Sequence, residues 1–520
     1  MPANIIFGTS NPVTVEGTKY INLEFGVFFD GTKNNKNNSD ARDAAVGTKE
    51  RKAFEEFGKK DKESSYYNDW SNVARKWKHY HPEKSIYIEG IGTGVDSLDV
   101  EQFASDTTKA FAVGTGHTGI RGKVRKGCKA LSEKIKLATR DFNKNKVIGK
   151  IYIDVFGFSR GAAAARNFVY EIHKSRYIAH SKSYSGGIGH GALAYKDSDG
   201  FEVPENLIKN GYLPAGGHLG LELSRKGLYI HPTKLVVRFL GIYDTVSSYA
   251  NLTELKWKQG LPLPNFSNDV NQLNLNTLKV NKIVHFTARD EHRENFALTK
   301  VSHGIEKTFP GVHSDIGGGY ITGEEIKKEI ETSWFAQFKT AGLGDLEELR
   351  KVLISEGWFK SNQLSVRGGN VLTPHRLHGA RFVKKEYSYI PLHFMCDYIG
   401  KADIKLLETE ELLDEYNIDK HPLLQKTKKY LKSYVLDENN KEALKFEWYS
   451  EIHKTYKGVK STDPKSVEYT KKLREQEDLR VLRNEYLHWS SDRDGIGMDP
   501  NTKWYDLKNA ASSGRKRTIY

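Results

Sequence analysis

The pattern of hydrophobic and polar positions is most informative at residues 151–166, IYIDVFGFSRGAAAAR. Residues 151–156 are mostly apolar and predict a buried strand, and the alanines at 162–165 predict a helix directly after it. Between them lies a G-x-S-x-G turn, residues 157–161, with Ser159 at its centre. A strand, a serine flanked by glycines and a helix form the sequence context of a nucleophile elbow. A serine that only caps the helix is the ordinary alternative.

Further apolar runs predict a repeating order of strands and helices. Helices are expected at 67–80, 121–142 and 387–399, and strands are expected at 19–29, 85–89, 234–242 and 282–287. Strands that alternate with helices favour a mostly parallel central sheet with helices on both faces. The expected fold class is therefore α/β and α/β-hydrolase-like, with large helical insertions.

Other segments lack this order, and they suggest the domain organisation. Within an expected catalytic core at 17–320, residues 33–43 predict a mobile polar loop. Residues 174–232, rich in Gly, Ser, His and Tyr, predict an insertion into that core. Residues 321–384 predict helical stretches with glycine-containing breaks, and residues 385–520 predict a mostly charged helical part that packs back on the core.

Charge changes the choice of partners. The chain has 520 residues, with 80 Lys and Arg against 66 Asp and Glu, which gives a formal charge of +14. Such an excess favours an anionic partner, such as a membrane surface or an acidic protein. The basic residues are dispersed except at 515–517, and no zinc-finger, RNA-recognition or helix-turn-helix signature occurs. We therefore expect no nucleic-acid partner.

Cysteine usage and hydropathy indicate where the protein is made. Cys128 and Cys396 are the two cysteines of the sequence. They do not form a disulfide framework, which favours synthesis in a reducing compartment. No segment approaches the roughly 18 apolar residues that a membrane-spanning helix needs. The N-terminal residues 1–17 lack the basic start and apolar run of a signal peptide, so any export is expected to use another route.

A serine at an elbow needs an acid and a base, which in this fold follow in the order Ser, Asp or Glu, His. Asp244 stands just past the predicted strand 234–242 and is the candidate acid, although a turn or capping role is the alternative. His313 lies in FPGVHSDIGGGY and is the candidate base. The glycines of that segment, expected to be an ordered loop, let the backbone approach the serine closely.

Other histidines and aspartates are alternatives. His285 lies within an apolar run and is expected to be a core histidine with satisfied hydrogen bonds, while His292 and His303 remain alternative bases. Asp290 and Asp315 are the rival acids. The position of Asp315, within the same loop as the candidate base, also fits a role in orienting that loop.

The roles follow from the chemistry of such a triad. Ser159 would attack an ester carbonyl, His313 would take and return the proton, and Asp244 would hold the imidazole and stabilise its charged form. Two backbone N–H groups must face the developing oxyanion. The expected donors are Arg160, which follows the nucleophile, and Gly31, in a turn after an early strand.

The remaining polar motifs add no cofactor. Glycine clusters at 90–94 and 114–122 lack the signatures of phosphate loops, so we interpret them as tight loops on the catalytic face. No cofactor and no metal are expected. The side chains of Arg160 and Arg166 are expected in structural salt bridges.

Four separated segments together resemble a known family: FFDGTKNN (28–35), GFSRGAAAAR (157–166), GIYDTVSS (241–248) and FPGVHSDIGGGY (309–320). They are similar to the α/β-hydrolase domain of bacterial type VI secretion phospholipase effectors, in particular the first lipase-effector family. The similarity spans roughly residues 20–320 and resumes at 389–402.

The resemblance implies an antibacterial secreted phospholipase that hydrolyses acyl esters of membrane glycerophospholipids. It implies the same triad of Ser159, Asp244 and His313. It also implies synthesis in the bacterial cytoplasm, secretion without a signal peptide through a type VI spike protein, action at the periplasm and membrane of the target cell, and a cognate immunity protein. Residues 321–384 would be an inserted lid or membrane-docking module, with aromatic residues Trp334, Phe335, Phe338, Trp358 and Phe359.

Two alternatives remain open. The same fold and triad also suit a thioesterase or a hydrolase of soluble esters. A catalytically inactive module that binds a membrane or a spike protein would explain the basic composition without any chemistry.

Overall fold

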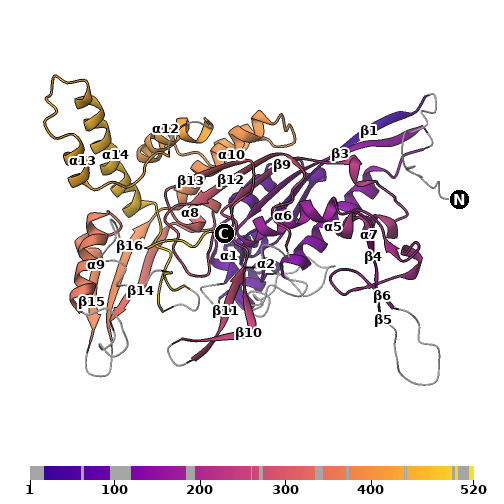
Figure 1. The fold of residues 1–520 in the computed structure, drawn as a ribbon, viewed down its shortest axis with the longest axis horizontal. Coiled ribbons are helices and arrows are strands. Elements are labelled where there is room, and N and C mark those ends of the chain that lie inside the picture. The colour runs from indigo at the N-terminus through magenta and orange to yellow at the C-terminus, as the bar shows by residue number, and fades with distance from the viewer. Residues whose placement is uncertain are drawn as a thin grey trace.

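A parallel sheet lies at the centre of the computed structural model (Figure 1). The structure describes residues 17–59, 64–93, 119–143, 145–182, 194–258, 261–268, 273–333, 343–369, 374–437, 440, 442–494, 498–501 and 515–520. In spatial order the six strands are β13 (Ile305–Phe309), β12 (Val280–Ala288), β9 (Leu235–Tyr243), β3 (Lys146–Phe158), β1 (Lys19–Phe29) and β2 (Ser85–Ile88). Every neighbouring pair is parallel, which confirms the predicted α/β class.

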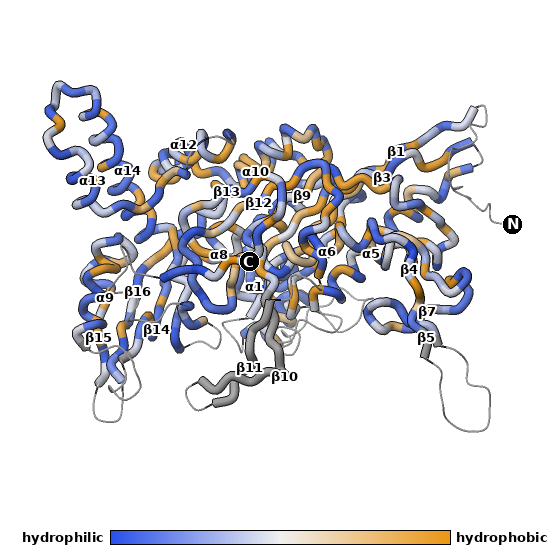
Figure 2. The backbone as a smooth tube through the Cα atoms, viewed as in Figure 1, coloured by the Kyte–Doolittle hydropathy of each residue, from blue (hydrophilic) through white to orange (hydrophobic). Residues whose placement is uncertain are grey.

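Helices cover both faces of this sheet, because its strands carry apolar residues on both sides. Val27 and Val155 belong to a core that they share with α5 (Ile120–Ala138), α6 (Arg160–Ile172) and α7 (Gly217–Arg225). Phe28 and Phe156 face the opposite core, which contains α3 (Asn72–Lys78), α10 (Tyr389–Lys401), α12 (Pro422–Leu436) and α14 (Lys465–Glu485). The hydrophobic colouring of the central strands in Figure 2 reflects this double burial.

The strand order reverses at β1. From β1 the chain passes outward to β2 and then returns to β3 on the other side of β1. In open α/β sheets, ligands bind at the carboxyl ends of the strands where the order reverses in this way. Phe29 at the end of β1 pairs with Gly157 of β3, and Phe158 pairs with Tyr243 at the end of β9. The segments that follow these three strands therefore meet at one place.

The predicted mobile loop at 33–43 is wrong, because helix α1 (Lys36–Asp43) occupies most of it. The side chain of Asn35 accepts a hydrogen bond from the N–H of Asn37 and caps this helix. Asn38 is buried and donates to the hydroxyl of Ser65. Two asparagines of the run that suggested a loop therefore have structural roles: Asn35 caps a helix and Asn38 makes a buried contact. A second short helix, α2 (Lys49–Ala53), follows.

The predicted insertion at 174–232 contains short antiparallel strands followed by α7. Strands β4 (Tyr177–Ile178) and β8 (Tyr212–Leu213) form one pair, and β5 (His180–Lys182), β6 (Ala194–Lys196) and β7 (Glu202–Val203) form another small sheet. A further antiparallel hairpin is formed by β10 (Ser248–Lys258) and β11 (Leu261–Asn268).

The helical prediction for residues 321–384 is largely wrong. Strands β14 (Gly323–Ser333), β16 (His375–Val383) and β15 (Leu364–Gly368) form an antiparallel sheet there, accompanied by helix α9 (Leu343–Ser355). Within this sheet Glu325 of β14 accepts a hydrogen bond from Arg381 of β16 in a buried ion pair, so charged residues occupy inward positions. Trp358 and Phe359 are buried in the core, whereas Trp334, Phe335 and Phe338 lie outside the described residues.

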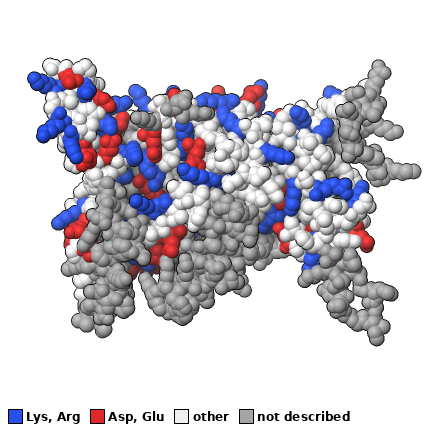
Figure 3. Space-filling model, viewed as in Figure 1, with Lys and Arg blue, Asp and Glu red and all other residues white. Residues whose placement is uncertain are grey.

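The remaining helices form a layer after α10. They are α11 (Thr409–Glu415), α12, α13 (Tyr449–Thr455) and α14. Cys128 and Cys396 are both buried as free thiols. Lys and Arg side chains are interspersed with Asp and Glu on the surface seen in Figure 3. Within the described part of the chain, no helix has the length and apolarity needed to cross a membrane.

Candidate active site

Ser159 lies at the turn between β3 and α6 in a strained conformation. Its φ of 59° and ψ of −129° are unusual for a residue with a side chain, and such strain typically costs about 1–3 kcal/mol. The N–H of Ser159 donates to the carbonyl of Tyr243 at 3.0 Å, and its own carbonyl accepts from the N–H of Val246 at 3.3 Å. The segment around residue 244 therefore holds the elbow from one side.

The glycines that flank Ser159 are required by space. A Cβ at Gly161 would lie 2.1 Å from the carbonyl oxygen of Asp30, and a Cβ at Gly157 would lie 2.7 Å from the Cα of Ala162. Helix α6 begins at Arg160, immediately after the serine. Its N-terminus therefore places positive dipole charge next to the serine.

Asp244 and His313 form a buried pair beside this elbow. The Nδ1 of His313 lies 2.5 Å from the Oδ2 of Asp244. The Oδ1 of Asp244 also accepts from the N–H of Ala288 at 2.8 Å, which ties the acid to the end of β12. Like Ser159, Asp244 has a positive φ, here 42°. His313 begins the short helix α8 (His313–Gly317), where an ordered loop was expected.

Burial and charge act in opposite directions on this pair. Burial lowers the pKa of His313 below its ordinary value of 6.5, although the hydrogen bond to Asp244 opposes that change. Burial alone would raise the pKa of Asp244, but the Arg517 guanidinium and His313 outweigh it and hold that pKa well below 3.8. The arrangement favours a neutral imidazole beside an ionised carboxylate.

Aromatic rings connect His313 to the elbow. The ring of Phe158, the residue before Ser159, lies with its centroid 4.6 Å from that of His313. Phe296 contacts the same imidazole at 5.0 Å in an edge-to-face arrangement. The serine, acid and base segments predicted from the sequence are therefore in direct mutual contact.

The two expected oxyanion donors differ. The N–H of Arg160 lies in the first turn of α6, next to the nucleophile. The N–H of Gly31 already donates to the Oδ1 of Asp30 at 2.7 Å. Asp30 is buried and is further bound by the hydroxyls of Ser71 and Tyr87. Gly31 would therefore have to leave Asp30 in order to serve as an oxyanion donor.

The rival histidines have other partners. His285 is fully buried, accepts from the N–H of Thr245 at 3.1 Å and contacts Glu306 at 3.0 Å, as expected for a core histidine. Burial lowers the pKa of His292 to about 3, and its Nε2 lies 2.8 Å from the hydroxyl of Ser491. His303 is exposed beside Ser302.

The rival acids hold loops in place. Asp290 accepts from the N–H of Gly311 at 2.7 Å. Asp315 accepts from the N–H of Val312 and contacts the ring of His488 at 2.7 Å. The loop-orienting alternative for Asp315 is thus the one observed.

Hydrogen bonds to neutral oxygens hold the two arginines for which salt bridges were predicted. Arg160 donates to the hydroxyl of Thr32 at 2.8 Å. Arg166 is buried and donates to carbonyls of Leu275, Thr299 and Lys300. Both side chains bind neutral oxygens, which connects α6 to neighbouring loops without a carboxylate partner in these bonds.

No role for Arg517 was predicted, because residues 515–517 suggested only surface charge. Its Nη1 and Nη2 donate to both carboxylate oxygens of Asp244, at 2.6 and 2.8 Å. The sequence separation of 273 residues hides this contact from any local pattern.

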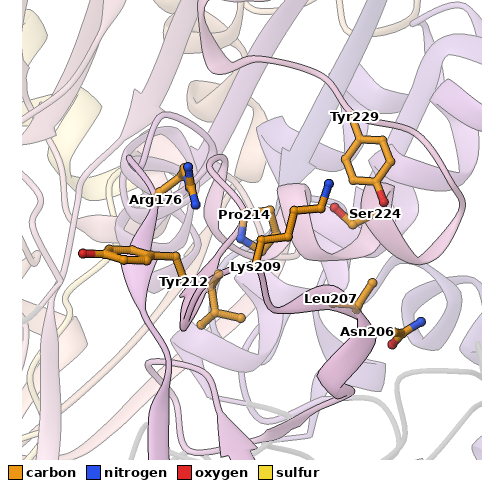
Figure 4. Close-up of a pocket in the computed structure, with 9 residues that line it drawn as sticks. Arg176, Asn206, Leu207, Lys209, Tyr212, Pro214, Ser224 and Tyr229 are labelled. Atoms are coloured by element: carbon orange, nitrogen blue, oxygen red, sulfur yellow. The ribbon is translucent and has the colours of Figure 1, made fainter. Parts of the chain in front are cut away.

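Two described pockets lie away from these residues. One, of about 120 Å³, is lined by residues of the 174–232 segment, including Arg176, Lys209, Tyr212 and Tyr229 (Figure 4). Another, of about 450 Å³, lies between the loop at 289–292 and the C-terminal helical layer. Ser159, Asp244 and His313 line neither of them.

The fold and this geometry define an α/β protein with a strained serine between strand and helix and a buried His–Asp pair against it. Residues 24–398 match the family described as "T6SS, Phospholipase effector Tle1-like, catalytic domain". This match covers most of the chain, which therefore belongs to that family of type VI secretion phospholipase effectors, as the sequence motifs indicated. Family membership makes it a lipolytic hydrolase of the secreted effector class.

Two solved structures are similar to this chain. One is described as "Structure of the Tle1 effector bound to the VgrG spike from the Type 6 secretion system"; it has a TM-score of 0.53 and 18% identity, over 97% of this chain and 94% of that chain. The other, an uncharacterized protein from Pseudomonas aeruginosa, has a TM-score of 0.37 and 14% identity, over 95% of this chain and 66% of that one. At such identities the first likeness concerns the fold alone. No curated protein matches.

Proposed function

We propose that this chain hydrolyses acyl esters of membrane glycerophospholipids through Ser159, His313 and Asp244. The observation that carries the proposal is the strained Ser159 at the strand–helix turn, in contact with the segments of a buried His313–Asp244 pair. Family membership supports the lipid substrate class. The reaction itself follows from the chemistry of these three groups.

In the first step the Oγ of Ser159 attacks the ester carbonyl carbon while the Nε2 of His313 takes the hydroxyl proton. Collapse of the tetrahedral intermediate breaks the bond to the glycerol oxygen, and the imidazolium gives that oxygen its proton. A lysophospholipid leaves and an acyl-enzyme remains. Water then attacks the acyl-enzyme with the same base, which releases a fatty acid and restores the serine.

The negative charge of the intermediate needs fixed donors. The N–H of Arg160 at the start of α6 is the first, reinforced by the helix dipole. We retain Gly31 as the candidate second donor, with its N–H exchanging Asp30 for the oxyanion. Asp244 keeps the Nδ1 proton of His313 in place and stabilises the imidazolium.

The cellular role is proposed on the same basis. The related effector described as bound to the VgrG spike supports a spike protein as a partner of this chain. The chain would be made in the bacterial cytoplasm, carried by the secretion machine, and act against the membrane of a rival cell from its periplasm. A cognate immunity protein would protect the producer.

Residues 321–384 are the candidate lid or membrane-docking module within this proposal, and the division into 17–320, 321–384 and 385–520 belongs to it. On β14 and β16 of this module, Ile326 and Phe382 are 51% and 58% exposed. Apolar side chains exposed in this way suit contact with lipid.

The test is fatty-acid release from vesicles of phosphatidylethanolamine and phosphatidylglycerol. Ser159→Ala should reduce release by at least about 10⁴-fold, whereas Ser355→Ala, at an exposed serine on α9, should not. Equal release by wild type and Ser159→Ala would refute the nucleophile. Cleavage of soluble esters or thioesters alone would favour the second hydrolase class. No hydrolysis with retained vesicle binding would favour a binding module.

A further inference from the structure

Residues 515–520 dock as an added strand beside the loop at 296–300. The N–H of Leu298 donates to the carbonyl of Thr518 at 2.9 Å, and the N–H of Tyr520 donates back to the carbonyl of Leu298 at 2.8 Å. Lys300 adds a third backbone bond, to the carbonyl of Tyr520. Figure 1 accordingly places the end of the chain at the middle of the molecule, beside α8.

This docking inserts the side chain of Arg517 behind the acid. The side chain is 5% exposed, and its two terminal nitrogens bind both oxygens of Asp244. Its Nε donates to the carbonyl of Phe296 at 2.7 Å, and Nη1 also contacts the carbonyl of Ala288. Phe296 is the residue whose ring packs against His313. Arg517 thus holds both the carboxylate and a wall of the imidazole site.

Other charged groups also surround the pair. Glu291 and Arg293, in the loop after β12, act on His313 from one side and bind each other. His285 of β12 faces Asp244 from within the sheet. Since Glu291 and Arg293 form their own ion pair, the direct hydrogen-bonded charge partners of Asp244 among the described residues are His313 and Arg517.

We infer that Arg517 is a positioning residue for the His313–Asp244 pair, so that residues 515–520 complete the catalytic site. The inference rests on the proposed function. A bidentate guanidinium fixes the plane of a carboxylate as well as its charge. It leaves Oδ2 directed at the Nδ1 of His313, and it keeps a buried carboxylate ionised that desolvation would otherwise neutralise.

The same contact has a predictable effect on pH dependence. Arg517 neutralises part of the charge of Asp244, which weakens the attraction of that carboxylate for an imidazolium. Without the guanidinium, His313 gains a proton more readily and Asp244 is less firmly ionised. The first change protonates the base at a higher pH, and the second protonates the carboxylate that holds the base at a higher pH, so the acidic limb of the activity profile moves upward.

Arg517→Gln in the full chain tests this. We expect a fall in turnover of about 10- to 100-fold, as for other groups that orient a reacting residue, and an acidic limb displaced to higher pH. The same displacement should appear in the rate at which a fluorophosphonate labels Ser159, a reading independent of vesicle binding. Lys516→Gln, at the exposed neighbouring position, should match the wild type in both measurements.

Arg517→Lys keeps the charge but not the bidentate contact with Asp244. It should give an intermediate turnover and a smaller displacement of the acidic limb. A folded Arg517→Gln with wild-type turnover and profile would overturn the inference. If that variant does not fold, Arg517→Lys decides, and wild-type turnover and profile there would overturn it equally. Failure of the proposed function is distinct: the wild type itself would release no fatty acid, or Ser159→Ala would remain active.

Discussion

Ser159 and Asp244 both occupy turns with positive φ at the carboxyl edge of the sheet, yet different parts of the chain hold them there. The turn at Ser159 needs its own neighbours Gly157 and Gly161, whose missing side chains leave room for the backbone of Ala162 and of Asp30. The turn at Asp244 depends on Ala288 and Arg517, which are distant in sequence. Local and long-range interactions therefore build two halves of one site. The glycines of the first half are visible in the local sequence, whereas the contacts that hold the second half are not.

The largest effect on activity should come from removing the charge of Asp244, the acid that long-range contacts hold. Asp244→Asn removes the charge and the acceptor that hold the imidazole proton, and should lower kcat by about 10⁴-fold. Steady-state hydrolysis of phospholipid vesicles measures it. Asp290→Asn, at a rival acid, should retain most of the activity. The reverse ranking of the two variants would move the acid to Asp290.

A substitution at Asp244 should also lower the free energy of unfolding. Asp244→Ala leaves Arg517 buried without its carboxylate, and a buried ion pair that loses one partner typically costs about 3–5 kcal/mol. Urea unfolding gives the change in free energy. Asp43→Ala, which removes a largely exposed partner of Arg42, should cost less than about 1 kcal/mol. Equal costs would mean that long-range contacts do not hold the acid turn.

A substitution at the elbow should change stability in the opposite direction. Ser159→Gly abolishes activity but relieves the strained backbone, and should raise the free energy of unfolding by about 1 kcal/mol after the extra chain entropy of glycine. Thermal and urea unfolding report it. Ser159→Ala retains the Cβ and should gain much less. A loss of stability in Ser159→Gly would show that the elbow is unstrained.

The smallest expected effect is the pH dependence of activity that His313 causes. His313 must be neutral to accept the serine proton, so activity falls as pH drops through its pKa. Because burial holds that pKa below 6.5, the acidic limb of kcat/KM should lie below pH 6.5, with little change between pH 7 and 8. A midpoint above 6.5 would mean that Asp244 dominates over burial.

The same distinction explains what could be predicted from the sequence. The elbow and five of the six strands of the parallel sheet are local patterns of hydrophobicity and glycine, and they were predicted correctly, whereas β13 was not predicted. Asp244 and His313 could be chosen because strand ends meet at one edge of a parallel sheet, and the structure places them 2.5 Å apart.

The failures arose where long-range pairing decides the structure. Residues 321–384 suggested helical stretches with glycine-containing breaks, but Glu325 and Arg381 pair across strands of an antiparallel sheet. The helix at Lys36–Asp43 begins at a capping Asn35 within a run that suggested a loop. The contact of Arg517 had no local signature at all, because its meaning depends on a residue 273 positions earlier.

The 273-residue separation of Asp244 and Arg517 has a consequence during synthesis of the chain. A ribosome adds roughly 5–20 residues per second, so Asp244 is synthesised about ten seconds to one minute before the arginine that binds it. During that interval a nascent chain can form the elbow but lacks the guanidinium beside its acid. The acid turn therefore acquires its last charged partner well after the elbow that it serves has been synthesised.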